Sequence, residues 1–343
     1  MIIDAHLHVW DRDWHPEWLW EFFRRVPDFG NGMEKSEFER NFVPAYCDLT
    51  GETLIAEMDK SGTDISILMC VDWGLADPED RPKKSIWQQN EDHAAICKRY
   101  PDRVAFFFGV DPRRHDAPEL LEAGVKELGA VGWKCYPPAG WWPSDKAYYP
   151  MYEKAQELDI PVLFHCGPVA CPPGPLKMKY SHPLAYSDLL IDFPELNVIL
   201  AHNGLNWWHE STGVLKLVGS AIADLGWWPS VVHPEVFREP AREEGFWRDI
   251  RHIFDNLEDR LVYASDYNGV PPVPAGRGLE SIVVMKKYTD LWRRFAQAEE
   301  KYGVPFTNAE MENFFHRRIR QLIPKIDEMA RAHEAVPAGS SAS

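Results

Sequence analysis

Short apolar runs alternate with amphipathic segments along almost the whole chain of 343 residues. A continuous apolar run of this kind is typical of a strand that is buried on both faces of a parallel sheet. We expect eight such strands, at residues 2–10, 65–71, 104–110, 130–136, 160–165, 197–202, 221–225 and 260–266, with 221–225 the weakest. A strand followed by a helix, repeated eight times, predicts an α/β fold of the (β/α)8 TIM-barrel type.

The segments between the expected strands have apolar residues at helical spacing, as in residues 91–100 and 117–128. No Gly-x-Gly-x-x-Gly motif follows a strand, which argues against a doubly wound dinucleotide-binding fold. We therefore expect one barrel domain over residues 1–334, with a last helical segment at 308–331 that packs against or caps the barrel. Residues 335–343 are small and polar, which is typical of a disordered tail.

The composition excludes several classes of protein. The net charge of −16 argues against nucleic acid and anionic membrane surfaces as partners. The longest apolar run, residues 65–71, is far too short to span a bilayer, and we expect no signal peptide before the first strand. The six cysteines include no Cys-x-x-Cys pair, and two of them lie in expected buried strands. We therefore expect reduced thiols and a cytoplasmic protein.

Long connections that follow expected strands carry many of the 15 tryptophans. These connections are residues 11–48, 137–149, 203–219 and 226–244. They would lie at the C-terminal face of a barrel, where barrel enzymes place their chemistry. Small cores packed beneath the loops explain most of these tryptophans. The alternative is that a few of them line a pocket for a flat or apolar substrate, so we expect long, aromatic-rich loops around the site.

Side chains that can bind a metal occur near the C-terminal ends of five expected strands. His6 and His8 are two residues apart, so their imidazoles project from one face of a strand and can grip one divalent metal. The other candidates, each at or near the end of a later strand, are Lys134, His165, His202 and Asp266. A single polar residue at a strand end is usually a cap or a turn former. Six metal-compatible residues at like positions instead predict a metal site.

The order of these residues, His-x-His in the first strand, His in the fifth and sixth, and Asp in the eighth, resembles the amidohydrolase superfamily. The local sequences Ile-Asp-Ala-His-Leu-His, Ala-His-Asn-Gly and Ala-Ser-Asp-Tyr are similar to its amidohydrolase-2 branch. That branch also contains decarboxylases such as aminocarboxymuconate semialdehyde decarboxylase. The resemblance runs from Asp4 to about Leu322. It implies a metal-dependent enzyme with a small-molecule substrate, and it admits a homodimer.

The resemblance also implies a role for each candidate residue. The implied metal ligands are His6, His8, His165 and Asp266. His202 would be a further ligand or a free acid/base beside the metal, and Asp266 would also accept a proton from the attacking water. The cofactor would be one or two divalent ions, Zn first and Mn, Fe or Co as alternatives, because imidazole and carboxylate ligands suit these metals. A water on such a metal is acidified to a pKa of about 7.

Lys134 is expected to point into the barrel at the level of the metal, where an unpaired ammonium is costly next to a dication. Carbamylation by CO2 would turn it into an anionic carboxylate that can bridge two metals, and similar superfamily members carry such a lysine in the fourth strand. With His165 and His202, Lys134 fits that two-metal pattern, which favours hydrolysis by metal-activated water. The alternative is a plain lysine that pairs with a carboxylate or binds substrate.

Further residues that follow expected strands are candidates for contact with substrate: Trp73, Arg113, Tyr136, Trp207 and His209. Arg113 could clamp a substrate carboxylate with both arms of its guanidinium, although surface ion pairing also explains its position. Packing explains Trp73 equally well. His209 is the loop histidine that stands out, because it belongs to an aromatic connection on the face where the chemistry is expected.

We expect a metal-dependent hydrolase that cleaves an amide, ester, lactone or C–N bond of a small aromatic or planar substrate. The alternative is a metal-dependent non-oxidative decarboxylase of a small aromatic or unsaturated acid. A second alternative is a degenerate barrel with only a binding role. The presence of every ligand type in the chain argues against that last alternative.

Overall fold

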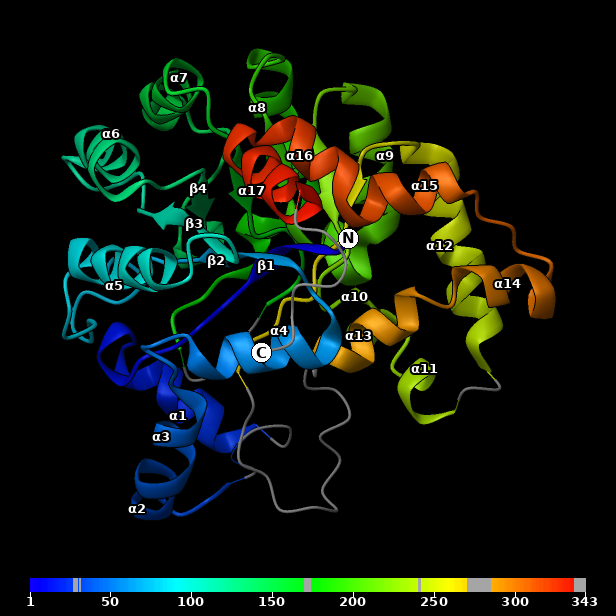
Figure 1. Ribbon diagram of the computed structural model, residues 1–343. Coiled ribbons are helices and arrows are strands. Elements are labelled where there is room, and N and C mark those ends of the chain that lie inside the picture. Colours follow the sequence, from blue (N-terminus) through cyan, green and yellow to red (C-terminus); the bar gives the residue numbers. More distant parts are fainter. Residues whose placement is uncertain (27–29, 31, 170–173, 240–241, 270–284, 336–343) are drawn as a thin grey trace.

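Eight parallel strands form one sheet in the order of the chain, which confirms the predicted TIM barrel (Figure 1). The computed structural model describes residues 1–26, 30, 32–169, 174–239, 242–269 and 285–335. Each strand pairs in parallel with the next one along the chain. The strands are β1 Ile3–Leu7, β2 Ile65–Met69, β3 Val104–Gly109, β4 Trp133–Cys135, β5 Val162–Phe164, β6 Val198–Leu200, β7 Ile222–Asp224 and β8 Leu261–Val262.

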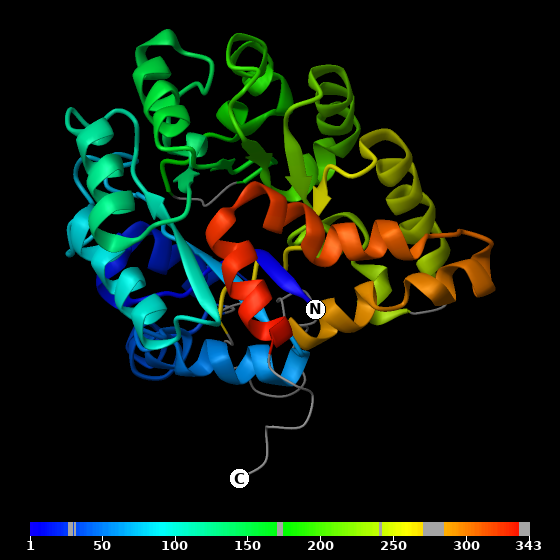
Figure 2. The same cartoon turned by 45° about the horizontal axis from the view of Figure 1, so that its top comes forward.

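Helices surround the sheet and connect consecutive strands, as Figure 2 shows. None of the helices in the described part of the chain is long and apolar enough to cross a membrane. The connecting helices are α4 Glu52–Ser61, α5 Ile86–Arg99, α6 Ala117–Leu128, α7 Tyr149–Glu157, α8 Ser187–Asp192, α9 Trp208–Val218 and α12 Glu243–Leu257. Smaller helices are α10 Trp228–Val232, α11 Glu235–Arg238, α13 Met285–Trp292, α14 Phe295–Tyr302 and α15 Asn308–Glu312.

Helix α5 begins at Ile86, earlier than the predicted residue 91, because a capping box precedes it. The Gln88 N–H donates to Oγ of Ser85 at 3.3 Å, and the Ser85 N–H donates to Oε1 of Gln88 at 3.0 Å. Two backbone donors that a helix start would leave without partners are satisfied in this way. The apolar spacing alone did not reveal this first turn.

The long connection after β1 folds into short helices with an aromatic core of their own. Its helices are α1 Glu17–Arg25, α2 Lys35–Glu37 and α3 Val43–Tyr46. The buried aromatic side chains of this core are Trp10, Trp18, Trp20, Phe23, Phe38, Phe42, Tyr46 and Trp73. Packing therefore accounts for most of the aromatic residues in this connection, as one of the two alternatives predicted.

Backbone hydrogen bonds join the first strand to the segment around β8, which has only two residues in strand conformation. The Ala5 N–H donates to the Tyr263 carbonyl at 3.0 Å, and the Asp266 N–H donates to the His6 carbonyl at 2.8 Å. These bonds bring the beginning of the chain next to the end of the sheet. The strand ends that carry the candidate ligands consequently lie close together at one end of the barrel.

Strand β1 contains a register shift that changes the face on which its side chains lie. Asp4 pairs with Ser66 of β2. Leu7 pairs with Leu68, so three steps along β1 match two steps along β2, as in a β-bulge. Ala5 belongs to the core cluster of the barrel interior, whereas Leu7 belongs to the cluster formed with the surrounding helices. The simple alternation that we expected for the first strand is therefore interrupted before the histidine pair.

Helices α16 Arg318–Leu322 and α17 Pro324–Ala335 cover the end of the barrel near the N-terminus (Figure 2). The apolar side chains that they add to the interior cluster are Ile319, Ile323, Ile326, Met329 and Ala330. The predicted capping by the C-terminal helical segment is thus confirmed. Ala335, the first residue of the predicted tail, ends α17, and residues 336–343 lie outside the residues that the structure describes.

We expect Ile326→Ala to lower the free energy of unfolding by about 2–5 kcal/mol, because Ile326 is fully buried in the interior cluster and alanine would leave a cavity. The neighbouring Lys325 is exposed, so Lys325→Ala should change the free energy by no more than about 0.5 kcal/mol. Urea unfolding followed by tryptophan fluorescence measures both. Equal stabilities of the two variants would show that the packing of α17 against the barrel interior does not stabilise the fold.

Candidate metal site

His6, His8 and Asp266 meet at the C-terminal end of the barrel. Nε2 of His6 lies 3.5 Å from Oδ1 of Asp266, and Nε2 of His8 lies 3.4 Å from the same oxygen. All three side chains are buried, and their ligand atoms are close enough together to hold one metal ion. The structure thus brings together three of the residues for which the sequence predicts a ligand role.

Hydrogen bonds on the far side of the rings determine which nitrogen carries the proton. Nδ1 of His8 lies 2.9 Å from the Met69 carbonyl oxygen, which can only accept, so Nδ1 must donate. Nδ1 of His202 donates in the same way to the Gly226 carbonyl at 2.8 Å. Nε2 of each neutral ring therefore keeps its lone pair. A nitrogen in this unprotonated form can bind a metal or accept a proton. Burial also lowers the pKa of His8, which favours the neutral ring.

His165 and His202 extend this cluster. The ring centroid of His202 lies 5.0 Å from those of both His6 and His165. Nε2 of His165 is buried and has no hydrogen-bond partner among the described residues, although such an atom costs about 1–3 kcal/mol when it is left unsatisfied. His165 is not part of the tightest group of ligand atoms. An imidazole nitrogen without a partner beside an imidazole and carboxylate cluster nevertheless fits a divalent metal.

Lys134 reaches into the same cluster from β4. Its Nζ lies 2.8 Å from Nε2 of His6, and the side chain is only 2% exposed. Burial lowers the pKa of Lys134 to about 8. Part of the amine is then neutral near neutral pH, and the neutral amine is the form that reacts with CO2. The predicted carbamylation of Lys134 is chemically accessible and stays a prediction.

Left-handed backbone conformations gather at the ends of β6, β7 and β8. The φ angles of His202, Trp227 and Asp266 are 61°, 56° and 55°. Residues other than glycine rarely adopt this conformation, and such strain often lies at functional sites. Burial opposes ionisation of Asp266, but the neighbouring His6 and His202 lower its pKa to about 2, so it is a carboxylate at neutral pH.

Of the predicted substrate contacts, Tyr136 lies beside the cluster, and Trp73 packs against Tyr136. The ring centroid of Tyr136 is 4.9 Å from that of His165 and 4.7 Å from that of Trp73. Arg113 is engaged elsewhere, because its guanidinium donates two hydrogen bonds to the carboxylate of Asp111, at 2.9 and 2.6 Å. The structure therefore favours the ion-pairing alternative for Arg113 over the substrate clamp.

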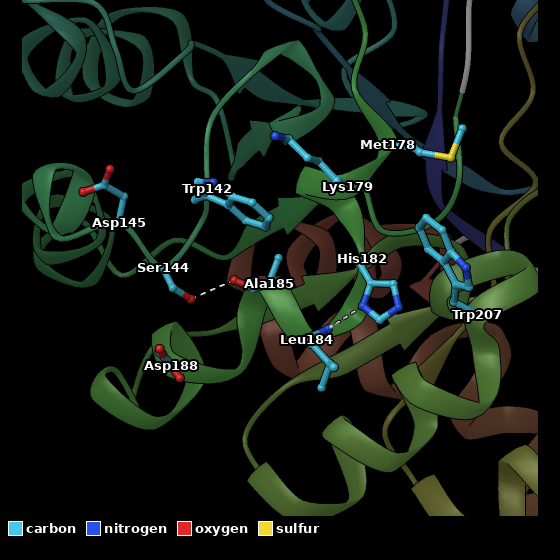
Figure 3. Close-up of a pocket in the computed structure, with 10 residues that line it drawn as sticks. All are labelled: Trp142, Ser144, Asp145, Met178, Lys179, His182, Leu184, Ala185, Asp188 and Trp207. Carbon is cyan, nitrogen blue, oxygen red and sulfur yellow. Dashed lines mark hydrogen bonds between the residues drawn. The ribbon is translucent and has the colours of Figure 1, made fainter.

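The other two predicted contacts lie away from the cluster. His209 is exposed and stacks on Trp208, with ring centroids 3.6 Å apart, while His252 of α12 lies 6.2 Å from His209. Trp207 lines an open hollow of about 790 Å³, in which Figure 3 shows it across His182 from Trp142. The residues that line this hollow are Trp142, Ser144, Asp145, Met178, Lys179, His182, Leu184, Ala185, Asp188 and Trp207. None of them is a candidate metal ligand, so this hollow is not the predicted metal site.

Two buried carboxylates near the cluster were not predicted from the sequence. Asp224 ends β7, and its Oδ2 lies 3.0 Å from Nδ1 of His6. Oδ1 of Asp4 accepts from the Ser265 N–H at 2.9 Å, and burial raises the pKa of Asp4 to about 7. A signal for Asp224 was present, because it lies near the end of an apolar run, where other strands carry candidate ligands. That run was the weakest of the eight.

The family model described as Amidohydrolase matches residues 3–310. The chain is 33% identical over 232 residues to the 2-keto-4-carboxy-3-hexenedioate hydratase of Sphingobium sp.. The match covers 62% of this chain and 62% of the hydratase, which is less than two thirds of that relative.

Solved structures with a similar fold include a hydratase and a decarboxylase. The 4-oxalomesaconate hydratase of Rhodopseudomonas palustris is 20% identical, with a TM-score of 0.56 and coverage of 97% of this chain and 99% of that one. The 5-carboxyvanillate decarboxylase of Novosphingobium aromaticivorans, solved with bound manganese, is 17% identical, with a TM-score of 0.57 and coverage of 94% and 96%. At these identities the similarity establishes the fold alone.

The buried amine of Lys134 predicts a pH dependence of stability in the metal-free protein. Its pKa falls from 10.5 to about 8 on folding, so between these values the unfolded chain binds more protons and the free energy of unfolding rises with pH. We expect the stability of wild type relative to Lys134→Met to rise by about 2 kcal/mol between about pH 7.5 and about pH 9.5. Urea unfolding at both pH values measures this difference, and a constant difference would contradict the prediction.

Proposed function

The chain belongs to the amidohydrolase family, and we propose that it is a metal-dependent lyase acting on a small unsaturated or aromatic carboxylic acid. The relative at 33% identity is a hydratase, and the proteins of similar fold include a second hydratase and a decarboxylase. These relatives support the lyase alternative better than the predicted hydrolase. Within the lyases we place hydration of a carbon–carbon double bond first, because the relative with substantial sequence identity is a hydratase.

One observation carries the proposal, namely the direction of the imidazole lone pairs. Nε2 of His6 and Nε2 of His8 both lie within 3.5 Å of Oδ1 of Asp266, a carboxylate that is charged at neutral pH. The residues that we propose to hold a divalent metal are His6, His8, His165 and Asp266. Zn was expected first, and manganese accompanies the decarboxylase of similar fold. Imidazole and carboxylate ligands suit both, so we propose either metal.

When bound, the metal would polarise a substrate oxygen or acidify a water molecule. His202 is the acid/base candidate, because its Nδ1 donates to the Gly226 carbonyl and its Nε2 is therefore able to take up a proton. Asp266 can accept a proton from water at its carboxylate. Lys134, in its charged form, can donate a hydrogen bond to a substrate carboxylate. All three side chains are buried, which strengthens their electrostatic interaction with substrate.

The aromatic ring beside His165 supports a planar substrate. Tyr136 lies next to His165 and Trp73 packs against Tyr136, and flat conjugated acids pack well against such faces. We propose that the substrate is a planar acid whose carboxylate lies toward Lys134. The predicted homodimer and the cytoplasmic location remain predictions.

Hydrolysis by a two-metal site remains the second candidate, and one observation favours it. The Lys134 amine lies within the cluster, and its pKa is lowered to about 8, which suits carbamylation. The carbamate, together with His165 and His202, would then hold a second ion. Metal content distinguishes this candidate from the lyase, because the lyase needs one ion per chain.

We expect His165→Ala and Asp266→Ala to retain far less metal than wild type, because each removes a proposed ligand. Elemental analysis after reconstitution with Mn or Zn and gel filtration measures the occupancy. His252→Ala is the matched control, since this histidine is exposed on α12 away from the cluster. Full occupancy in His165→Ala would show that the proposed ligand set is wrong. Two ions per wild-type chain would favour the two-metal hydrolase.

The reaction class can be tested with a defined panel of substrates. We expect the metal-loaded protein to remove the ultraviolet absorbance of 2-keto-4-carboxy-3-hexenedioate as water adds to its double bond, or to release CO2 from an aromatic acid such as 5-carboxyvanillate. Aryl amides and esters should be turned over much more slowly. His202→Gln should lower kcat by at least about 100-fold while it retains metal, because the acid/base is lost. Preferential cleavage of amides or esters would overturn the lyase proposal.

A further inference from the structure

The two carboxylate oxygens of Asp224 contact different parts of the candidate site. It is fully buried at the end of β7. Oδ2 lies 3.0 Å from Nδ1 of His6. Oδ1 accepts from the N–H groups of His202, at 2.8 Å, and of Gly226, at 2.9 Å. One side chain therefore contacts a proposed metal ligand and the backbone of the proposed acid/base.

His6, His202 and Asp224 also form a second group whose atoms are close enough together for a metal ion. The hydrogen bonds argue against that use. Nδ1 of His202 donates to the Gly226 carbonyl, so Nδ1 carries a proton and only Nε2 of this ring has a lone pair. Oδ1 of Asp224 already accepts two N–H groups. The group is therefore a hydrogen-bonded network, in which the Nδ1 atoms face the protein and the Nε2 atoms face the site.

We propose that Asp224 is a positioning residue that holds His6 in the Nδ1–H tautomer and orients His202 through its backbone. The inference rests on the proposed function, because it assigns Nε2 of His6 to the metal. Burial raises the pKa of Asp224, while the N–H groups of His202 and Gly226 that donate to Oδ1 favour its carboxylate form. A carboxylate can only accept, so the atom of His6 that faces it must donate. Nζ of Lys134, which as an ammonium can only donate, lies 2.8 Å from Nε2 of His6. Both neighbours of the ring thus require the same tautomer.

The connection to His202 is carried by strained backbone. His202 has a φ of 61°, and its N–H is held by Oδ1 of Asp224. A side-chain carbon at Gly226 would lie 3.1 Å from Cβ of Asp266 and 3.2 Å from Oδ1 of Asp224, so glycine allows these strand ends to approach. Asp224 consequently ties together the ends of β6 and β7 beside the segment that carries Asp266.

The substitution Asp224→Asn separates the two functions of the carboxylate. The amide oxygen can still accept from the N–H groups of His202 and Gly226. The amide nitrogen then faces Nδ1 of His6, and it can only donate. Nδ1 must accept, so the proton moves to Nε2 and blocks the lone pair that the metal needs. A role limited to packing would leave the tautomer unchanged, because Asp and Asn have nearly the same shape.

The experiment uses metal-free full-length protein labelled with 15N-histidine, in which two-bond 1H–15N spectra identify the tautomer of each ring. The His6 signals are assigned by their absence in His6→Gln. We expect Nδ1–H at His6 in wild type and Nε2–H in Asp224→Asn. His202 should keep Nδ1–H in both, because the Gly226 carbonyl determines it. Titration with Mn or Zn should show affinity about 10- to 100-fold lower for Asp224→Asn.

Asp111→Asn is the matched control, because Asp111 is also a buried carboxylate at a strand end but contacts Arg113 and not the cluster. It should leave the His6 tautomer and the metal affinity unchanged. An Nδ1–H tautomer and wild-type affinity in Asp224→Asn would overturn the inference. If Asp224→Asn does not fold, the wild-type spectrum alone tests the inference. An Nε2–H tautomer of His6 in wild type would overturn it. A wild type that binds no metal but shows the tautomer switch would refute the proposed function and leave the positioning role intact.

Discussion

The backbone hydrogen bond between the Asp266 N–H and the His6 carbonyl, 2.8 Å long, is the contact on which the candidate site depends. It joins residue 6, near the start of the chain, to residue 266, in its last third. Bringing together such distant segments costs conformational entropy. The favourable free energy of folding the whole barrel must offset this cost. The histidine pair at the start of the chain and the carboxylate near its end therefore become one site only in the closed barrel.

The interior of the barrel is apolar at the end that α16 and α17 cover and polar at the C-terminal end of the strands. At the covered end, aliphatic side chains of the strands pack against Ile326 and its neighbours on α16 and α17. At the C-terminal end of the strands, buried imidazoles are tolerated because their Nδ1 atoms have acceptors, such as the Met69 carbonyl for His8 and the Gly226 carbonyl for His202. The orientation of the lone pairs is a consequence of these outer hydrogen bonds, so the surrounding backbone determines what the site can bind.

The aromatic loops serve different purposes in different places. Trp18 and Trp20 pack within the connection after β1 and support its short helices. Trp73 belongs to the same aromatic core, but its contact with Tyr136 brings that core next to His165. Trp207 lies instead at an outer hollow. An aromatic residue on the catalytic face of a barrel is thus no guide to its role until its neighbours are known.

The eight strands, the barrel and the residue types at the strand ends can be predicted from the amino-acid sequence, because they follow from local hydrophobic periodicity and from motifs such as His-x-His. Which of those side chains meet depends on the folded barrel. Asp224 contacts His6 across 218 positions of the chain, whereas Arg113 is occupied by Asp111, and His209 stacks outward on Trp208. The register shift in β1 also has no local signature. Such pairings depend on how distant segments pack and on which polar partner each buried group finds, and a pattern within one segment contains neither.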